Sequence, residues 1–168
     1  MLDSLITSKT RLRLLIKFFL NIANKGYLNG LANEFGESTN SVRKELNNLS
    51  SAGYLEKYNE NNKIVYMANA SHPFFKIIQR IVKKHLGIEE ILETVLKRIG
   101  DVKKIMILGD YAEGIDSGHI EILIVGDNIS KVYLNEITPK IEKKINRKVS
   151  FFLSNSTLKQ KTLTIFEA

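Results

Sequence analysis

The sequence of 168 residues contains no cysteine. This absence excludes disulfide bonds, and it excludes zinc and iron–sulfur sites that are held by cysteine. The three histidines, at positions 72, 85 and 119, are scattered along the chain. We therefore expect no metal and no cofactor, and we expect a protein of the reducing cytoplasm.

Long hydrophobic runs are also missing. The apolar segment 12–23, LRLLIKFFLNIA, is too short to cross a bilayer and contains Arg13 and Lys17. It also lacks the small-residue cleavage site of a signal peptide. We interpret it as a buried amphipathic helix and expect no membrane partner. With 43% hydrophobic residues the chain can still bury a core, and its length allows one large domain or two small ones.

Positive charge is present in excess, and it is unevenly distributed. Residues 1–104 hold 17 Lys and Arg against 10 Asp and Glu, whereas residues 105–168 hold 8 of each kind. The formal net charge of +7 therefore lies entirely in the first part of the chain. A basic half beside a neutral half favours a polyanion as the partner of the first half, although a solvated lysine-rich surface gives the same composition.

In the first half of the chain, apolar residues recur at helical spacing and then alternate as in the strands of a hairpin. Helices are predicted over 8–24, 28–36 and 38–53, the third capped by Ser38 or Thr39. Two alternating runs, 54–58 and 63–68, flank an Asn-rich segment and predict a β-hairpin. Further helices are predicted over 73–86 and 88–100.

The period changes to that of strands after residue 101. Strands are predicted over 102–109 and 119–126, and again over 148–154. Between the last two, residues 130–147 predict a helix that kinks or restarts near Pro139. The segment beyond residue 154 has no clear period, and no element is predicted there.

Three helices followed by a hairpin is the order of elements in a winged helix-turn-helix. In such a motif the second helix of the pair enters the DNA major groove through its N-terminal residues. The candidate base or backbone contacts on the predicted helix 38–53 are Ser38, Thr39, Asn40, Ser41, Arg43, Lys44 and Asn47. Backbone or minor-groove contacts are expected from Lys57, Asn61, Asn62 and Lys63 on the hairpin, and phosphate contacts from Lys9 and Arg11. The alternative is that this polar face is merely solvated.

Residues 8–70 resemble winged-helix transcriptional regulators of the ArsR type. The resemblance is most specific from Leu31 through STNSVRKELNNLSSAGYLE. Many regulators of this type sense metals through clusters of cysteine or histidine. This chain has no such cluster, so metal sensing does not carry over. We expect His72, beside Pro73, to have a structural or capping role.

The stretch ILGDYAEGIDSGHIEILIVGD, residues 107–127, resembles the minimal nucleotidyltransferase domain. That domain has a Gly-Ser turn followed by a strand with two Asp one residue apart, which bind Mg²⁺ with the nucleotide phosphates. On this pattern Asp110 replaces the Ser, and a third carboxylate would fall near Ser150 or Phe152, where there is none. The corresponding positions in this chain are Gly109, Asp110, Gly114, His119 and Glu121.

The resemblance implies a nucleotidyltransferase-like shape without its metal chemistry, and hence no enzyme. Mg²⁺ strongly prefers oxygen ligands, so His119 is a poor substitute for Asp, and Glu121 is the one carboxylate left at the three positions. The alternative is a shifted metal site that uses Asp110, Asp116 and Glu121.

Winged-helix domains joined through helices to nucleotidyltransferase-like domains form a group of regulators. This chain resembles that group in the segments SHPFFKIIQRIVKKHLGIEEIL and GDYAEGIDSG. The resemblance implies an α+β fold with a winged helix-turn-helix over 1–72, a helical connector over 73–101 and a small α/β nucleotidyltransferase-like domain over 102–168. It implies a sequence-specific regulator that binds double-stranded DNA. For the second domain three roles stay open: sensing an unknown small-molecule effector, self-association, or support of the DNA-binding domain alone. The alternatives are an active nucleotidyltransferase and an antidote-like partner of another protein. A homodimer is expected, through the apolar connector residues Phe74, Ile77, Ile78, Ile81 and Val82. The alternative is that this apolar stripe packs within the chain.

Overall fold

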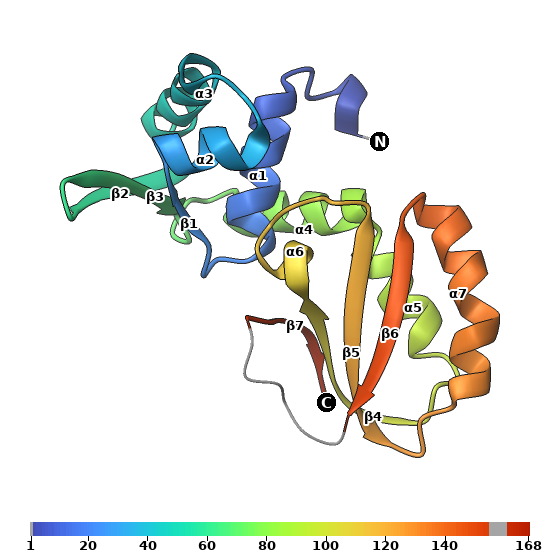
Figure 1. Cartoon of the computed structure of the whole chain (residues 1–168). Helices are drawn as coiled ribbons and strands as arrows, with labels where there is room; N and C mark the ends of the chain where they lie inside the picture. The colour runs from blue at the N-terminus through green and yellow to red at the C-terminus, as the bar shows by residue number, and fades with distance from the viewer. Residues whose placement is uncertain (1, 155–160) are drawn as a thin grey trace. The chain divides into compact units, whose positions relative to one another are not determined.

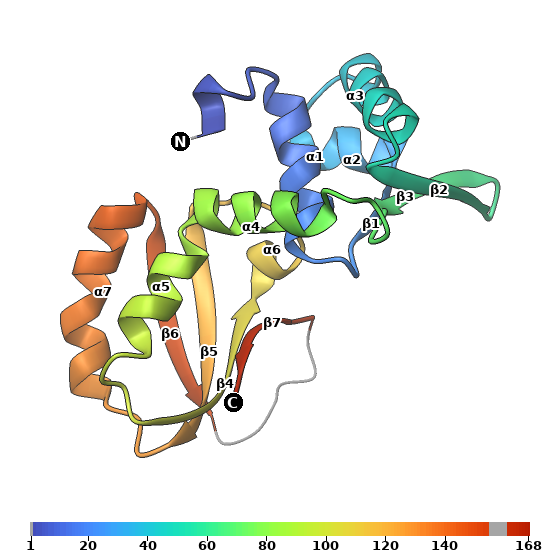
Figure 2. The same ribbon diagram turned by 180° about the vertical axis from the view of Figure 1, so that it is seen from behind.

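The chain is a mixed α+β protein with two sheets in the part that the structure describes (Figures 1 and 2). The structure is a computed structural model, and it describes residues 2–154 and 161–168. The chain divides into two compact units, Met1–His85 and Leu86–Ala168, which we call the N-terminal unit and the C-terminal unit. The boundary between them falls inside the segment 73–101 that the sequence predicted as a connector.

The N-terminal unit contains the predicted helices and hairpin, together with a short strand. Its hairpin strands and β1 form an antiparallel sheet in the order β1-β3-β2. The elements are η1 (Leu2–Ser4), α1 (Lys9–Leu20), β1 (Lys25–Tyr27), α2 (Leu28–Phe35), α3 (Thr39–Ser51), β2 (Leu55–Glu60), β3 (Lys63–Ala68) and α4 (Phe75–Leu86), which ends at the boundary.

Local sequence signals set the helix ends of this unit. Ser8 and Ser38 are the N-caps of α1 and α3, and each side chain accepts a hydrogen bond from the amide three residues on. Gly36 ends α2 in the left-handed conformation. The prediction that the first helix continues to residue 24 was wrong, because Asn21 is extended and the chain then enters β1.

One apolar core holds α1, α2 and α3 together. It contains fully buried side chains from α1, and α2 and α3 contribute residues at helical spacing. Its members include Leu14, Phe18, Phe19, Leu20, Leu31, Val42, Leu46 and Leu49. This core fixes the position of α3 and leaves its opposite, polar face exposed to solvent.

The C-terminal unit is a four-stranded sheet with two helices on one face (Figures 1 and 2). The strand order is β6-β5-β4-β7, and only β5 and β6 are parallel, which requires the crossover helix α7 between them. The elements are α5 (Ile88–Val95), β4 (Asp101–Leu108), α6 (Gly109–Ala112), β5 (His119–Asp127), α7 (Lys131–Ile145), β6 (Lys148–Ser154) and β7 (Leu163–Glu167).

Several sequence predictions for this unit need correction. The helix predicted over 88–100 ends at Val95, the predicted glycine turn begins with the short helix α6, and β7 was not predicted. Helix α7 does not restart at Pro139 but runs continuously through it. Residues 155–160, for which the sequence predicted no element, lie outside the described residues.

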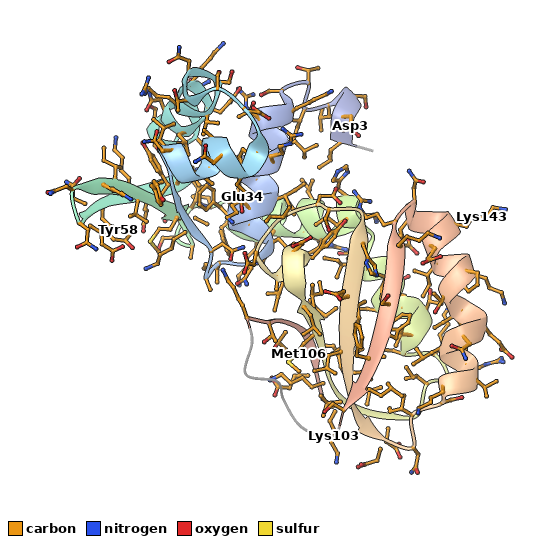
Figure 3. All side chains as sticks on the ribbon, in the orientation of Figure 1. Asp3, Glu34, Tyr58, Lys103, Met106 and Lys143 are labelled. Atoms are coloured by element: carbon orange, nitrogen blue, oxygen red, sulfur yellow. The ribbon has the colours of Figure 1, made fainter. Side chains whose placement is uncertain are left out.

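Both sheet faces of the C-terminal unit contain buried apolar residues. Ile120, Ile122 and Ile124 alternate along β5 and are fully buried, as expected for an interior strand. Met106, labelled in Figure 3, belongs to a second cluster with Leu123 and Leu108. None of the helices within residues 2–154 and 161–168 has the length and apolar character that crossing a membrane requires.

Candidate functional site

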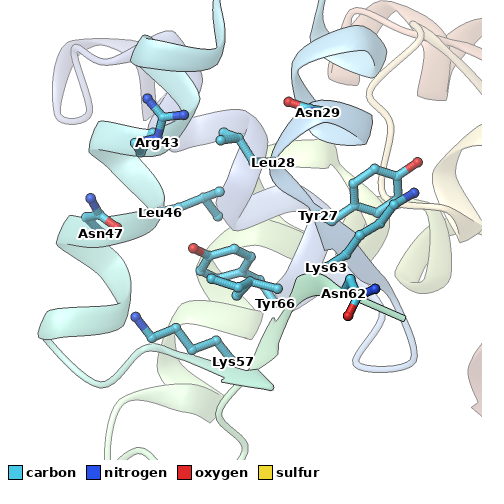
Figure 4. A pocket seen from close by; sticks show the side chains of 11 residues that line it. Tyr27, Leu28, Asn29, Arg43, Leu46, Asn47, Lys57, Asn62, Lys63 and Tyr66 are labelled. Atoms are coloured by element: carbon cyan, nitrogen blue, oxygen red, sulfur yellow. The ribbon is translucent and has the colours of Figure 1, made fainter. Parts of the chain in front are cut away.

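A pocket with a volume of about 520 Å³ lies between α3, the start of α2 and the β2–β3 hairpin (Figure 4). We call it the α3–hairpin groove. Its walls are polar and basic, and its floor is apolar and aromatic. It is lined by Tyr27, Leu28, Asn29, Arg43, Leu46, Asn47, Lys57, Asn62, Lys63, Ile64 and Tyr66.

Strand alternation explains the hairpin side of the groove. Lys57 is opposite Tyr66 in the β2–β3 register, so both side chains lie on the same face of the sheet. That face is buried near α3, where Tyr66 forms part of the groove floor, and it opens toward the hairpin tip, where Ile64 is 47% exposed. Lys57 therefore stands at the wall of the groove with an apolar surface beneath it.

Helical spacing explains the α3 side. Arg43 and Asn47 are four residues apart and lie on one exposed face, whereas Leu46 is buried at the floor of the groove (Figure 4). The guanidinium Nη1 of Arg43 donates a hydrogen bond to Oδ1 of Asn40, at 3.2 Å. Because an exposed arginine otherwise samples many rotamers, this contact favours one orientation of the side chain.

The groove brings together five of the residues proposed from the sequence, namely Arg43, Asn47, Lys57, Asn62 and Lys63. The others are exposed around the start of α3 or at the hairpin tip, or lie on α1, and do not line it. Ser38 caps α3, and Asn61 has a positive φ of 48° in the hairpin turn. Residues outside the groove are Lys9, Arg11, Ser38, Thr39, Asn40, Ser41, Lys44 and Asn61.

Three of the four basic residues of α1 are paired within the described part of the N-terminal unit, and Lys9 is the exception. Arg11 contacts Glu45 at 2.8 Å, Arg13 contacts Glu37, and Lys17 contacts Glu34 at 2.6 Å. These pairs use three of the six acidic residues of the unit, which has 13 Lys and Arg. Arg11, proposed from the sequence as a phosphate contact, is therefore engaged with a carboxylate on α3.

Glu45 is a structural carboxylate. It is 6% exposed and accepts hydrogen bonds from Ser8 and Arg11. Burial by itself raises the pKa of Glu45, but these hydrogen bonds outweigh burial and hold the pKa below its ordinary value. The residue is ionised at neutral pH and ties the start of α1 to α3.

The cations of the groove are not paired in this way. Among the salt bridges of the described residues, none involves Arg43, Lys57 or Lys63. The unit therefore pairs Arg11, Arg13 and Lys17 of α1 with glutamates and leaves the cations of the groove available to an external anion.

Tyr27, Asn29 and Tyr66 also line the groove, and the sequence did not identify them. Tyr27 ends a strand of three residues, which is too short for a recognisable period, and Asn29 lies in the first turn of α2. The available signal for Tyr27 was a tyrosine two residues after a lysine, in the segment KGYLNG.

His72 has the structural role expected from the sequence. Its Nδ1 accepts a hydrogen bond from the amide of Phe74, just before α4, and its Nε2 lies 3.2 Å from the carbonyl oxygen of Ala52. Its ring also packs on that of Tyr54, with 4.2 Å between centroids. These contacts tie the end of α3 to the segment before α4.

In the C-terminal unit, three of the five nucleotidyltransferase-like positions come together. Glu121 is opposite Leu108 on one side and Ser150 on the other, and Nε2 of His119 lies 2.7 Å from Oγ of Ser150. A Cβ at Gly109 would lie 2.5 Å from the Glu121 carboxylate, so the two residues are in contact. Glu121 lies on β5, which is an interior strand of the sheet.

Asp110 and Gly114 do not join these residues. Asp110 is exposed in the first turn of α6, and Gly114 is buried after its end. Asp116 is held by Arg147, through Nε at 2.9 Å and Nη2 at 2.6 Å, and also accepts a hydrogen bond from the buried Tyr111 hydroxyl. Among the described residues, no group of three His, Cys, Asp or Glu is arranged to hold a metal ion, and this includes the set Asp110, Asp116 and Glu121.

Comparisons with known proteins do not assign the chain to a family. No protein-family model matches it, and no curated protein matches it. Among solved structures the chain is similar to Sso10a-2, a DNA-binding protein from Sulfolobus solfataricus, with 18% identity over 50% of this chain and 85% of that one. The TM-score is 0.36, which is too low to define a shared fold.

Proposed function

We propose that this protein is a sequence-specific transcriptional regulator whose N-terminal unit is a winged helix that binds double-stranded DNA. The observation that carries the proposal is the α3–hairpin groove. Its three cations, Arg43, Lys57 and Lys63, have no salt bridge among the described residues, whereas three of the four cations of α1 are each paired with a glutamate. Such an arrangement favours an external polyanion.

The geometry of the groove suits one ridge of the DNA backbone. With α3 in the major groove, Arg43 and Asn47 reach base edges, and Lys57 and Lys63 meet phosphates on the adjoining strand. Leu28 and Asn29 bring the start of α2 to the same surface, and no side chain caps the N-terminus of that helix. Its free amides add to the positive potential there.

The experiment is a binding-site selection from a pool of random duplexes with the purified protein. We expect enrichment of a defined sequence, because Arg43 and Asn47 offer donors and acceptors to base edges. If the pool binds without enrichment, the protein binds DNA but does not read its sequence. If nothing binds at low salt, the assignment of the groove is wrong.

We also propose that the protein acts as a homodimer through α4. Phe74, Ile77 and Ile81 are 54%, 56% and 42% exposed, so they form an apolar stripe on the helix surface. Val82 is buried and therefore belongs to the core rather than to a dimer surface. If the protein is a dimer, the selected DNA sequence contains two related half-sites. Sedimentation that shows a monomer at tens of micromolar, with DNA binding intact, would exclude the dimer.

For the C-terminal unit we propose a nucleotidyltransferase-like domain without catalytic activity. The support is chemical: His119 and Ser150 stand where that chemistry needs carboxylates, and Glu121 remains beside Gly109. The test supplies labelled nucleoside triphosphates with Mg²⁺ or Mn²⁺ to the protein and to Glu121→Ala. Transfer of label by the parent and not by the variant would show an active site.

A further inference from the structure

The aromatic ring of Tyr27 connects the start of α2 with the hairpin tip. Lys63 begins β3, and its Nζ lies 4.3 Å from the centroid of the Tyr27 ring (Figure 4). The same ring packs on Gly30 of α2, where an added Cβ would lie 3.0 Å from the ring. The ring therefore has a fixed support on α2 and contacts the ammonium group of Lys63.

The backbone at Tyr27 is held from two directions. Tyr27 is paired with Val65 in the β1–β3 register, and it occupies the N-cap position of α2. Lys63, in contrast, is exposed and lies next to the hairpin turn, where its long side chain loses entropy in any single orientation. A cation over an aromatic face lowers the population of the other orientations without neutralising the charge.

We propose that Tyr27 is a positioning residue, which holds the ammonium group of Lys63 in the groove for contact with a DNA phosphate. This inference rests on the proposed function, since it names how one cation of the groove is prepared for its anion. Tyr27 provides no charge of its own, and its effect on DNA binding passes through Lys63.

The chain offers a matched control in a second lysine–tyrosine pair. Nζ of Lys25 lies 5.3 Å from the ring centroid of Tyr58 and donates a hydrogen bond to its hydroxyl at 3.0 Å. Tyr58 lies on the hairpin (Figure 3), in the same sheet as Tyr27, but neither member of the second pair lines the groove. If tyrosine contributes only to the stability of the sheet, the two pairs respond alike.

The first experiment is a double-mutant cycle, with duplex affinity measured across salt concentrations in the full-length protein. Lys63→Met is expected to reduce the salt slope by about one unit. Tyr27→Leu is expected to weaken binding about two- to fivefold, which is the size of an exposed cation–π contact. It is also expected to lower the salt slope. In the Lys63→Met background, Tyr27→Leu has no further effect, and Tyr27→Phe, which keeps the ring, preserves binding in the parent.

The outcomes separate this inference from the proposed function. If the parent binds no duplex, both fail. If Lys63→Met weakens binding while Tyr27→Leu does not, or if the two effects simply add, the positioning role is wrong and DNA binding stands. An equal loss in Tyr58→Leu also overturns it, because the effect then comes from sheet stability.

A second measurement needs no DNA. The ring current of Tyr27 shifts the Lys63 ε-methylene proton resonances upfield in the NMR spectrum of the free protein. We expect this shift in the parent and in Tyr27→Phe, and its loss in Tyr27→Leu. If the resonances of Lys63 are the same in all three proteins, the ring does not hold the side chain.

Discussion

Two arginines of the N-terminal unit differ in role because they differ in partner. Arg11 contacts a carboxylate that is 6% exposed, whereas Arg43 contacts the neutral amide of Asn40. The first arginine contributes to the fold, and the second keeps its full charge and its donors for a ligand. Both arginines were predicted from the sequence to contact DNA. The pairing of Arg11 could not be foreseen, because its acidic partner is 34 residues away along the chain.

We predict that Arg43→Ala costs about 1–3 kcal/mol of specific binding and relaxes the preference at one base position. Arg43→Lys should not restore that preference, because a lysine ammonium cannot replace a bidentate guanidinium at a guanine edge. Anisotropy titrations with the selected duplex and with single-base variants measure both effects. Equal weakening for every duplex would assign Arg43 to a phosphate instead.

At the scale of elements, long periodic segments were predictable and short ones were not. The ends of α3 and of both hairpin strands were predicted to within two residues, because apolar residues recur along them and Ser38 and Gly53 lie near the ends of α3. Strand β1 has three residues and α6 has four, so neither completes a recognisable period. The groove was predictable only in part. Tyr27 ends the short strand β1, whereas Asn29 and Tyr66 lie on predicted elements that only the folded arrangement brings to the groove.

The link between α1 and α3 predicts a pH-dependent stability. The folded pKa of Glu45 is below its ordinary value of 4.5, so its contribution is fully present above that pH and is lost as the pH falls through the folded pKa. We expect Glu45→Gln to destabilise the protein by about 1–2 kcal/mol at pH 7, because charge-assisted hydrogen bonds from Arg11 and Ser8 weaken.

Urea unfolding followed by circular dichroism measures this difference at several pH values. The gap between the parent and Glu45→Gln should close as the pH falls below about 4.5. Glu56→Gln is the control, since Glu56 is exposed on β2 and forms no salt bridge among the described residues. A gap of equal size at pH 7 and at acid pH would mean that the charge of Glu45 does not contribute.

At the scale of the whole molecule, net charge is divided between the two units. The N-terminal unit has 13 Lys and Arg against 6 Asp and Glu, and the C-terminal unit has 12 of each kind. Composition alone gave this asymmetry, but it could not show which cations are paired. Pairing depends on contacts between residues far apart in sequence, and it occupies Arg11, Arg13 and Lys17 while the three groove cations form no salt bridge among the described residues.

The most direct test of the central claim is the salt dependence of duplex binding from about 50 to 200 mM salt. It compares the parent with Arg43, Lys57 and Lys63 all changed to Gln, and with a control in which the exposed Lys131, Lys140 and Lys143 of α7 are changed to Gln. Both variants lose the same charge. Our account predicts that the slope falls by about two to three units in the groove variant and stays at the parental value in the control. Equal slopes in the two variants, or no binding by the parent at low salt, would contradict it.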